Sequence, residues 1–394
     1  MRAKRFCSGI AATAKREVGR ITKSGEYLAV VWWLPLSVAL FFAIFFSQEV
    51  VGALPIAIVD EDNTSLSRKV TAMIRATPQT SLVKEMPDMA TARDNILQGK
   101  VVAVVEIPEC FSKNILAGET ANVVFYDSGA NISTNSLAAK GIQTALTTFG
   151  VGVSLQQAEM QGVAPDKAMA QAMPIAFTTY GLFNPWLNYA YYVAPCFWAM
   201  IVIIAAMLST IYAVGRELRY ATSVEWLRAA NNSLIAALMG KLTPTTLFLW
   251  LLTIVIGVVI FGLFGAPMQG SWVVLAIGTV FLIFAYQAIA LFIIALTASM
   301  RLSLSLGGGY SVLAFTFSGV TFPTIAMFSW VQPFTMLFPY TYFMRLYIDQ
   351  AVRGTEWWLS MSDLAAILLF CILPLLLFGR LKNILTKRKF WGRL

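Results

Sequence analysis

The chain has 394 residues, of which 58% are hydrophobic and only 12% are charged. A soluble protein of this length needs a more charged surface, so the composition indicates an integral membrane protein. The sequence contains no histidine, which removes the commonest metal ligand and general base and disfavours a zinc enzyme or a hydrolase.

Six stretches are apolar and long enough to cross a bilayer, which takes a helix of roughly 20 apolar residues. We therefore expect an α-helical membrane protein with about six transmembrane helices. The first stretch is too long for the core of a signal peptide and is followed by no small-residue cleavage site, so we expect an uncleaved anchor. The predicted spans are residues 28–46, 190–214, 242–265, 272–298, 302–322 and 361–379.

Basic residues gather in the arm at 1–27, in the loop between the second and third spans, and in the tail at 382–394. By the positive-inside rule these segments face the cytoplasm, and six spans place both termini there. The net charge of +9 then follows from topology. Nucleic-acid binding is the alternative interpretation of the basic tails, and we do not expect such a partner.

The arm at 1–27 has a helical pattern of apolar residues. Ile10, Ala14, Val18 and Ile21 recur at spacings of three and four, with basic residues elsewhere around the helix. This pattern is typical of an amphipathic helix that lies in the cytoplasmic membrane interface and contacts lipids. A disordered basic leader is the alternative.

Residues 47–189 have the composition of a globular domain, and the predicted topology places them outside the cytoplasm. A short strand followed by a turn at 54–62 and strands at 101–108 and 122–129 alternate with helical segments at 63–76, 88–100 and 110–118, and 131–161 is also helical. This alternation predicts a compact α/β domain. Without histidine it can form no Ser/His/Asp or Cys/His site, so a binding or docking module is expected.

The acidic run Asp60, Glu61, Asp62 raises the question of calcium binding. An EF-hand loop needs glycine at its sixth position and glutamate at its twelfth, which here are Ser65 and Thr71. The motif fails. We expect a turn that caps the following helix, with Thr64 or Ser65 as the capping residue, and no metal site.

The sequence offers no internal energy source for transport. Residues 242–300 contain no charged residue, whereas ion-coupled transporters keep ionisable groups inside the bilayer. Gly240-Lys241 is followed by leucine and lacks the upstream glycine of a phosphate-binding loop. No cofactor is therefore expected in this chain, and a separate subunit would have to supply energy.

Such a subunit would contact the cytoplasmic loop at residues 215–233, GRELRYATSVEWLRAANNS. SVEWLRAA predicts a short helix whose Trp226 and Leu227 offer apolar contacts to a partner, while Glu217 and Glu225 offer negative charge to its basic residues. A solvated turn is the alternative. The candidate coupling residues are Arg216, Glu217, Glu225, Trp226 and Leu227.

A proline-rich apolar run near 323–350 cannot form one straight helix, because proline removes a donor and clashes with the preceding turn. Backbone groups freed in lipid need surrounding protein or a water-filled cavity. We therefore predict short re-entrant helices, with Arg345 and Asp349 paired where the run regains the surface. A loose loop is the alternative, but it would leave many apolar residues in water. The residues assigned to this element or to a substrate path are Phe322, Pro323, Pro333, Phe334, Pro339 and Tyr340.

The sequence resembles the membrane subunits of type-2 ABC exporters, the ABC-2 type transporters, in the branch with a large extracytoplasmic domain after the first span. The segments that carry the resemblance are LPIAIVDEDNTSLSRKV, GKVVAVVEIPECFSKNIL, GRELRYATSVEWL and FSGVTFPTIAMFSWVQPFTMLFPYTYFMRLYID. The loop departs from the family at Tyr220-Ala221-Thr222, where a charged and glycine-containing stretch is usual.

This resemblance implies a half-transporter of the bacterial inner membrane that exports drug-like or amphiphilic molecules. A second permease chain, identical or related, would join two cytoplasmic ATP-binding subunits that bind ATP and Mg. Their closure would push the interfacial helix and the 217–227 loop. The periplasmic domain would meet an adaptor protein.

The sequence is also compatible with two other functions. The chain could relay ATPase motion to the extracytoplasmic domain without any substrate path, and such a module needs no polar or aromatic cavity. A membrane-anchored enzyme is disfavoured by the lack of a catalytic constellation.

Overall fold

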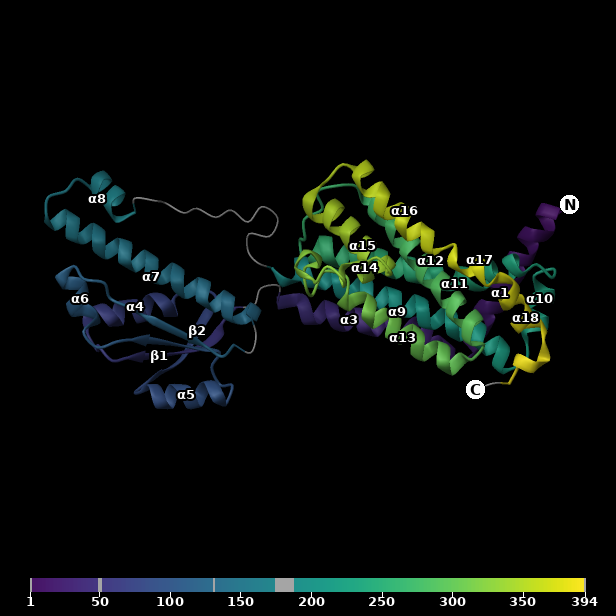
Figure 1. Ribbon diagram of the computed structural model, residues 1–394, viewed down its shortest axis with the longest axis horizontal. Helices are drawn as coiled ribbons and strands as arrows, with labels where there is room; N and C mark the ends of the chain where they lie inside the picture. Colours follow the sequence, from purple (N-terminus) through teal and green to yellow (C-terminus); the bar gives the residue numbers. More distant parts are fainter. Residues whose placement is uncertain (1, 49–51, 130–131, 174–187, 393–394) are drawn as a thin grey trace. The chain divides into compact units, whose positions relative to one another are not determined.

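The computed structural model describes residues 2–48, 52–129, 132–173 and 188–392 (Figure 1). The chain divides into two compact units. We call Val50–Gly181 the inserted domain, and Met1–Glu49 with Leu182–Leu394 the membrane unit. The predicted end of the insert at 189 follows residues 174–187, which lie outside the described residues.

The inserted domain is a four-stranded sheet in the order β2-β1-β3-β4, in which β4 alone runs antiparallel to its neighbour. Its strands are β1 Leu54–Asp60, β2 Thr80–Met86, β3 Ala103–Ile107 and β4 Val124–Asp127. Its helices are α4 Ser65–Arg75, α5 Met89–Leu97, α6 Phe111–Ala117, α7 Ile132–Met160 and α8 Pro165–Ala172. The α/β prediction for this segment agrees with the sheet, but it omitted β2.

The central strand β1 is apolar on both sides because helices cover both faces of the sheet. Ile56 and Ile58 pack toward α4, α6 and α7, while Ala57 and Val59 pack toward α5 on the other face (Figure 1). Successive side chains of a strand point to opposite faces, so a continuous apolar run suits a strand buried on both.

The acidic turn after β1 caps α4, as predicted. The Thr64 side chain accepts a hydrogen bond from the Ser67 backbone N–H, and the Ser67 hydroxyl bonds back to the Thr64 backbone. Asp62 Oδ2 accepts from the hydroxyls of Thr64 and Ser112, each at 2.6 Å. Burial raises the pKa of Asp62, but the hydrogen bonds from Ser112 and Thr64 outweigh it and hold this pKa below its usual value.

The membrane unit has five described helices that are long and apolar enough to cross a bilayer. They span Gly25–Phe45, Tyr191–Arg219, Leu234–Leu263, Trp272–Thr297 and Trp357–Leu376. They correspond to five of the six predicted spans, and they make the chain an α-helical, multi-pass membrane protein.

Two predicted span boundaries are wrong. The fifth predicted span, 302–322, is helical only as far as Thr316, because a turn follows in which Gly319 has φ +86°. The third begins at Leu234 rather than 242, capped by the Ser233 side chain. Lys241 therefore lies inside the helix and not in the loop before it.

The elements of the membrane unit fall into three runs along the chain, in which η marks a short 3₁₀- or π-helix. The first is α1 Arg2–Lys23, α2 Gly25–Leu28, η1 Ala29–Trp33, α3 Leu34–Phe45 and η2 Phe46–Gln48. The second is α9 Tyr189–Arg219, α10 Ser223–Ala229, α11 Leu234–Gly257, η3 Val258–Leu263, α12 Trp272–Thr297 and α13 Met300–Thr316. The third is η4 Thr324–Ala326, α14 Gln332–Thr335, α15 Pro339–Tyr347, η5 Ile348–Arg353, η6 Trp357–Ser360, α16 Met361–Phe370, α17 Leu373–Leu376, α18 Phe378–Thr386 and η7 Arg388–Phe390.

Helix α9 forms the centre of the membrane unit and contacts α3, α11, α12 and α13 (Figure 1). Ile203 and Ala206 are completely buried there, and the core continues into α12. Helix α13 approaches closely at Gly307, where a Cβ atom would stand 2.7 Å from the Ile211 Cδ1 atom of α9. Small residues allow such close helix packing in membranes.

Candidate functional site

Helix α1 lies directly against α11. A Cβ atom on Gly240 would stand 2.4 Å from the Ile10 carbonyl oxygen and 2.7 Å from Thr13 Cβ, so only glycine permits this approach. The predicted amphipathic helix is present. Its buried face, however, carries the polar Thr13 and Glu17, while Val18 is exposed. The arm is thus docked on the protein through polar as well as apolar groups.

Five charged residues meet where α1, α9 and α11 converge, and we call them the buried charge cluster. Lys241 Nζ lies 2.6 Å from Glu17 Oε2 and 2.8 Å from Glu217 Oε1. Arg16 Nη1 is 2.7 Å from Glu217 Oε1, and Arg20 forms an ion pair with the same oxygen. The side chains of Lys241, Glu17 and Glu217 are at most 1% exposed. Removing one partner from such a site leaves an uncompensated buried charge.

Hydroxyl groups complete the coordination of both carboxylates. Tyr27 donates its hydroxyl hydrogen to Glu17, and Thr222 donates to Glu217. The Ser223 hydroxyl donates to the backbone carbonyl of Glu217 at 3.1 Å. Because every carboxylate is both paired and hydrogen-bonded, the cluster meets the conditions under which buried charges are tolerated. The cluster connects α11 with three other segments: the first membrane helix, the end of α9 and the start of α10.

Trp226 supports this cluster from α10. Its ring is fully buried, with Lys241 Nζ 4.8 Å from the ring centroid, and its indole N–H donates to the Ala237 carbonyl at 3.2 Å. Leu227 is also buried. The prediction that these two side chains offer apolar contacts to a partner is therefore wrong, because their own subunit covers them.

The charged candidates of the loop separate into buried and exposed residues. Glu217 is occupied by cations of its own chain, so it does not offer charge to a partner as predicted. Glu225 has a 73% exposed side chain, 4.0 Å from Arg16, and can reach outward. Arg216 lies over the rings of Tyr27 and Tyr220. A role for these residues in coupling stays a prediction.

The proline-rich run is broken into short elements, as predicted. It forms η4, α14 and α15, and Pro333 and Pro339 stand in the first turns of the two α-helices, where the missing N–H costs nothing. Pro323 precedes η4. Phe322 and Phe334 are half-exposed, whereas Tyr340 is fully buried. Tyr340 therefore anchors α15 to α9, by donating its hydroxyl hydrogen to the Cys196 carbonyl at 2.7 Å.

The predicted pair between Arg345 and Asp349 is replaced by another pair. Asp349 binds Arg353 at 3.0 Å, and Arg345 lies 5.8 Å from the centroid of the Tyr342 ring. Both carboxylate–arginine spacings are four residues, so the sequence alone did not distinguish them.

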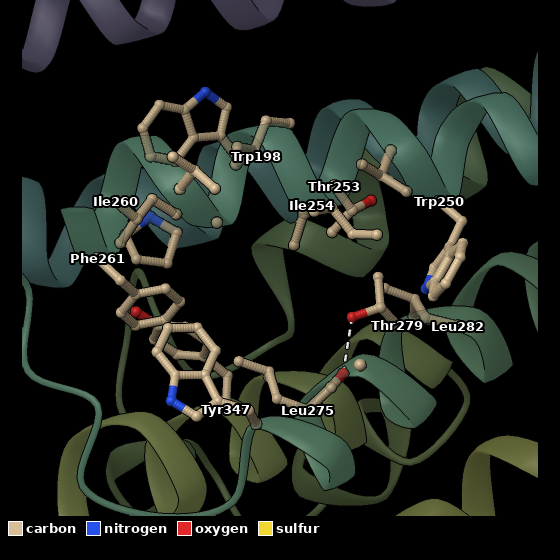
Figure 2. Close-up of a pocket in the computed structure, with 18 of the residues that line it drawn as sticks. Trp198, Trp250, Thr253, Ile254, Ile260, Phe261, Leu275, Thr279, Leu282 and Tyr347 are labelled. Atoms are coloured by element: carbon tan, nitrogen blue, oxygen red, sulfur yellow. Dashed lines mark hydrogen bonds between the residues drawn. The ribbon is translucent and has the colours of Figure 1, made fainter. Parts of the chain in front are cut away.

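A cavity of about 450 Å³ lies within the membrane unit between α9, α11 with η3, α12 and α15. Figure 2 shows Trp250 at one end and Ile260 with Phe261 at the other. None of the described residues that line it is charged. The hydroxyls of Thr253 and Thr279 donate within their own helices, to the carbonyls of Leu249 and Leu275, each at 2.8 Å. The oxygen of each threonine keeps a free lone pair and can accept a hydrogen bond.

Sequence reasoning missed both this cavity and most of the charge cluster. Glu17 carried a signal, since it is the only acidic residue in the first 25 positions. Lys241 was taken as a loop residue because it borders an apolar run. The cavity had a weaker signal in Gly257 and Gly262, which remove side chains from a helix rich in large apolar residues.

Residues 26–380 match the family described as ABC-2 family transporter protein. A protein of Escherichia coli strain K12 named "Probable multidrug ABC transporter permease YbhR" is 23% identical over 348 residues, which cover 87% of this chain and 90% of that protein. The protein of the same name from Escherichia coli O157:H7 has the same identity and coverage. No solved structure matches the chain.

The family match extends from the end of the N-terminal arm through the last membrane helix, so it includes the inserted domain and the cavity. Membership in this family generally implies an ATP-binding partner and dimerisation. The chain belongs to the ABC-2 family of transporter proteins, as a membrane-embedded permease subunit.

Proposed function

We propose that this permease is half of an ATP-driven exporter that moves drug-like or amphiphilic molecules out of the cytoplasm or inner membrane. Two ATP-binding subunits carry ATP and Mg, and a second permease chain, identical or related, completes the membrane part. Both termini face the cytoplasm of a bacterium, and the inserted domain lies on the periplasmic side, where it meets an adaptor protein. The multidrug designation of the E. coli relative supports the substrate class.

The observation that carries the proposal is the buried charge cluster. Glu217 ends α9 and leads into α10, Lys241 belongs to α11, and Arg16 belongs to α1. A force on the exposed side of α10 therefore acts on three helices at once, because short ion pairs and a close-packed core do not yield independently. α11 also walls the cavity, so the cluster connects the loop with a space for substrate.

The test uses inside-out vesicles that contain the chain and the ATP-binding subunit that copurifies with it. Hoechst 33342, ethidium and N-phenyl-1-naphthylamine serve as fluorescent amphiphiles. We expect ATP-dependent transport of at least one dye, and loss of this transport when the ATPase is inactivated.

Two outcomes would contradict the proposal. Normal ATP hydrolysis that changes the protease sensitivity of the inserted domain without moving any dye would identify a mechanical transmitter. Transport by the chain alone, with no ATPase present, would show an energy source within the chain.

A further inference from the structure

We propose that the cavity of each protomer binds one neutral, largely aromatic molecule that enters sideways from the bilayer. This assignment rests on the proposed function, because it names the substrate class and places its site inside a single chain.

The opening faces the side of the membrane unit that would be in contact with lipid. Three residues that line the cavity have exposed side chains: Ile254 is 45% exposed, Val258 62% and Trp272 54%. They come from α11, η3 and the start of α12, so the rim lies between two spanning helices. A molecule dissolved in the bilayer can reach such a rim without passing through water.

The lining suits flat rings. Trp198, Trp250, Phe261 and Tyr347 all border the cavity, and its volume of about 450 Å³ falls within the 300–1,000 Å³ typical of small-molecule sites. Aromatic faces and edges favour offset or perpendicular contacts with another ring over contacts with a flexible chain. A cavity bordered by several rigid rings therefore selects a ring system.

The same lining rejects charge. A buried ion needs a partner of opposite sign, and the described lining residues supply none. A cage of rings around one point could replace that partner for a cation. Phe261, Trp272 and Tyr347 do meet at one end of the cavity, but Phe261 packs edge-on against Trp272, with ring centroids 4.7 Å apart, so these rings contact one another. Trp250 stands at the opposite end (Figure 2). The hydroxyls of Thr253 and Thr279 already donate hydrogen bonds to carbonyls of their own helices. Their oxygens can therefore still accept a hydrogen bond from an O–H or N–H group of a neutral ligand.

The wall at Gly257 allows the cavity to be filled without disturbing the fold. A Cβ atom there would meet only the Phe261 ring, at 4.0 Å, so a larger side chain extends into the open space. Val255 lies two residues away on α11, is 57% exposed and does not line the cavity. Gly257→Phe and Val255→Phe are therefore a matched pair that adds the same ring inside and outside the site.

The experiment measures binding to the purified full-length chain in nanodiscs, without ATPase. The probes are neutral N-phenyl-1-naphthylamine, anionic 1-anilinonaphthalene-8-sulfonate and cationic tetraphenylphosphonium. We expect the neutral probe to saturate at one molecule per chain. Gly257→Phe should weaken binding of the neutral probe by about tenfold or more, because the added ring occupies space that the probe needs. A tenfold loss of affinity corresponds to about 1.4 kcal/mol of binding free energy. Val255→Phe should leave the affinity unchanged.

Each alternative result is decisive. Equal binding of the charged probes, or equal binding by both variants, would overturn the proposal. A retained phospholipid, seen by native mass spectrometry in the wild type and lost only in Gly257→Phe, would assign the cavity to an acyl chain instead. If Gly257→Phe fails to fold, Ala276→Phe on α12 replaces it. Binding without ATP-driven efflux would leave this site standing and refute only the exporter function.

Discussion

Lys241 is the cation that joins the two carboxylates of the buried charge cluster. Lys241→Met leaves Glu17 without its cation and removes one of the three cations that pair with Glu217. We expect a loss of about 3–5 kcal/mol in the free energy of unfolding, because an unpaired charge stays buried. Thermal unfolding in detergent measures it, with Arg228→Met on the exposed side of α10 as the control.

Adding Glu17→Gln to Lys241→Met should recover part of this loss, because the orphaned charge is then removed as well. A single variant as stable as the wild type would show that the cluster does not hold α1 in place.

Glu225 separates a coupling role from a structural one. Its side chain is exposed, so Glu225→Gln should leave thermal stability within about 0.5 kcal/mol of the wild type. If α10 contacts the ATP-binding subunit, this variant should lower substrate-stimulated ATP hydrolysis in the assembled complex. Normal stimulation would exclude this residue from the contact.

Asp62 makes the inserted domain sensitive to acid. Its pKa is lower in the folded domain than in the unfolded chain, where it is about 3.9. Its contribution to stability is therefore complete above that unfolded value and is lost as pH falls through the folded pKa. Hydrogen exchange in α4 and α6, corrected for intrinsic rates, should show faster opening across this acidic range. Asp62→Asn should open faster at neutral pH and show a smaller change with pH.

At the scale of elements, the contact between α1 and α11 depends on one glycine. Gly240→Leu places a side chain where the Ile10 carbonyl and Thr13 now lie, so the two helices must separate. We expect α1 to become sensitive to protease and the melting temperature to fall. Gly19→Leu is the control, because a Cβ atom on Gly19 has no neighbour within 4 Å. Equal behaviour of the two variants would contradict the close approach.

The elements of the proline-rich run differ in how deeply they are buried. Tyr340 and the buried part of α15 fix the run to α9, while Phe322, Phe334 and Trp330 stay exposed on shorter pieces. The cavity lies beside this anchor, through Phe343 and Tyr347, rather than along the exposed pieces. A substrate path in this protomer is therefore better sought among α9, α11 and α12.

At the scale of the whole molecule, the proposed orientation can be tested with the chain's own cysteines. Cys7 on α1 and Cys110 in the inserted domain are both exposed. In single-cysteine variants, a membrane-impermeant maleimide should label Cys110 from the outside of spheroplasts and Cys7 only in inside-out vesicles. Labelling of both residues from one side would overturn the topology.

The sequence by itself determined that this chain crosses a membrane and carries an inserted α/β domain. Long apolar runs and alternating strands and helices are local patterns, and a local pattern fixes an element regardless of its neighbours. The proline spacing likewise excluded one straight helix between 323 and 350. The capping turn at Asp60–Thr64 was also predictable, because a cap needs only nearby residues.

Only the tertiary structure decided what the polar residues do. Glu17, Glu217 and Lys241 are far apart in the sequence, and their pairing arises from the packing of α1, α9 and α11. That packing buried Trp226, which the loop sequence suggested was available to a partner. It also left the uncharged cavity, because a cavity exists only where helices fail to fill the space between them. Charge and volume of this kind are properties of the assembled bundle.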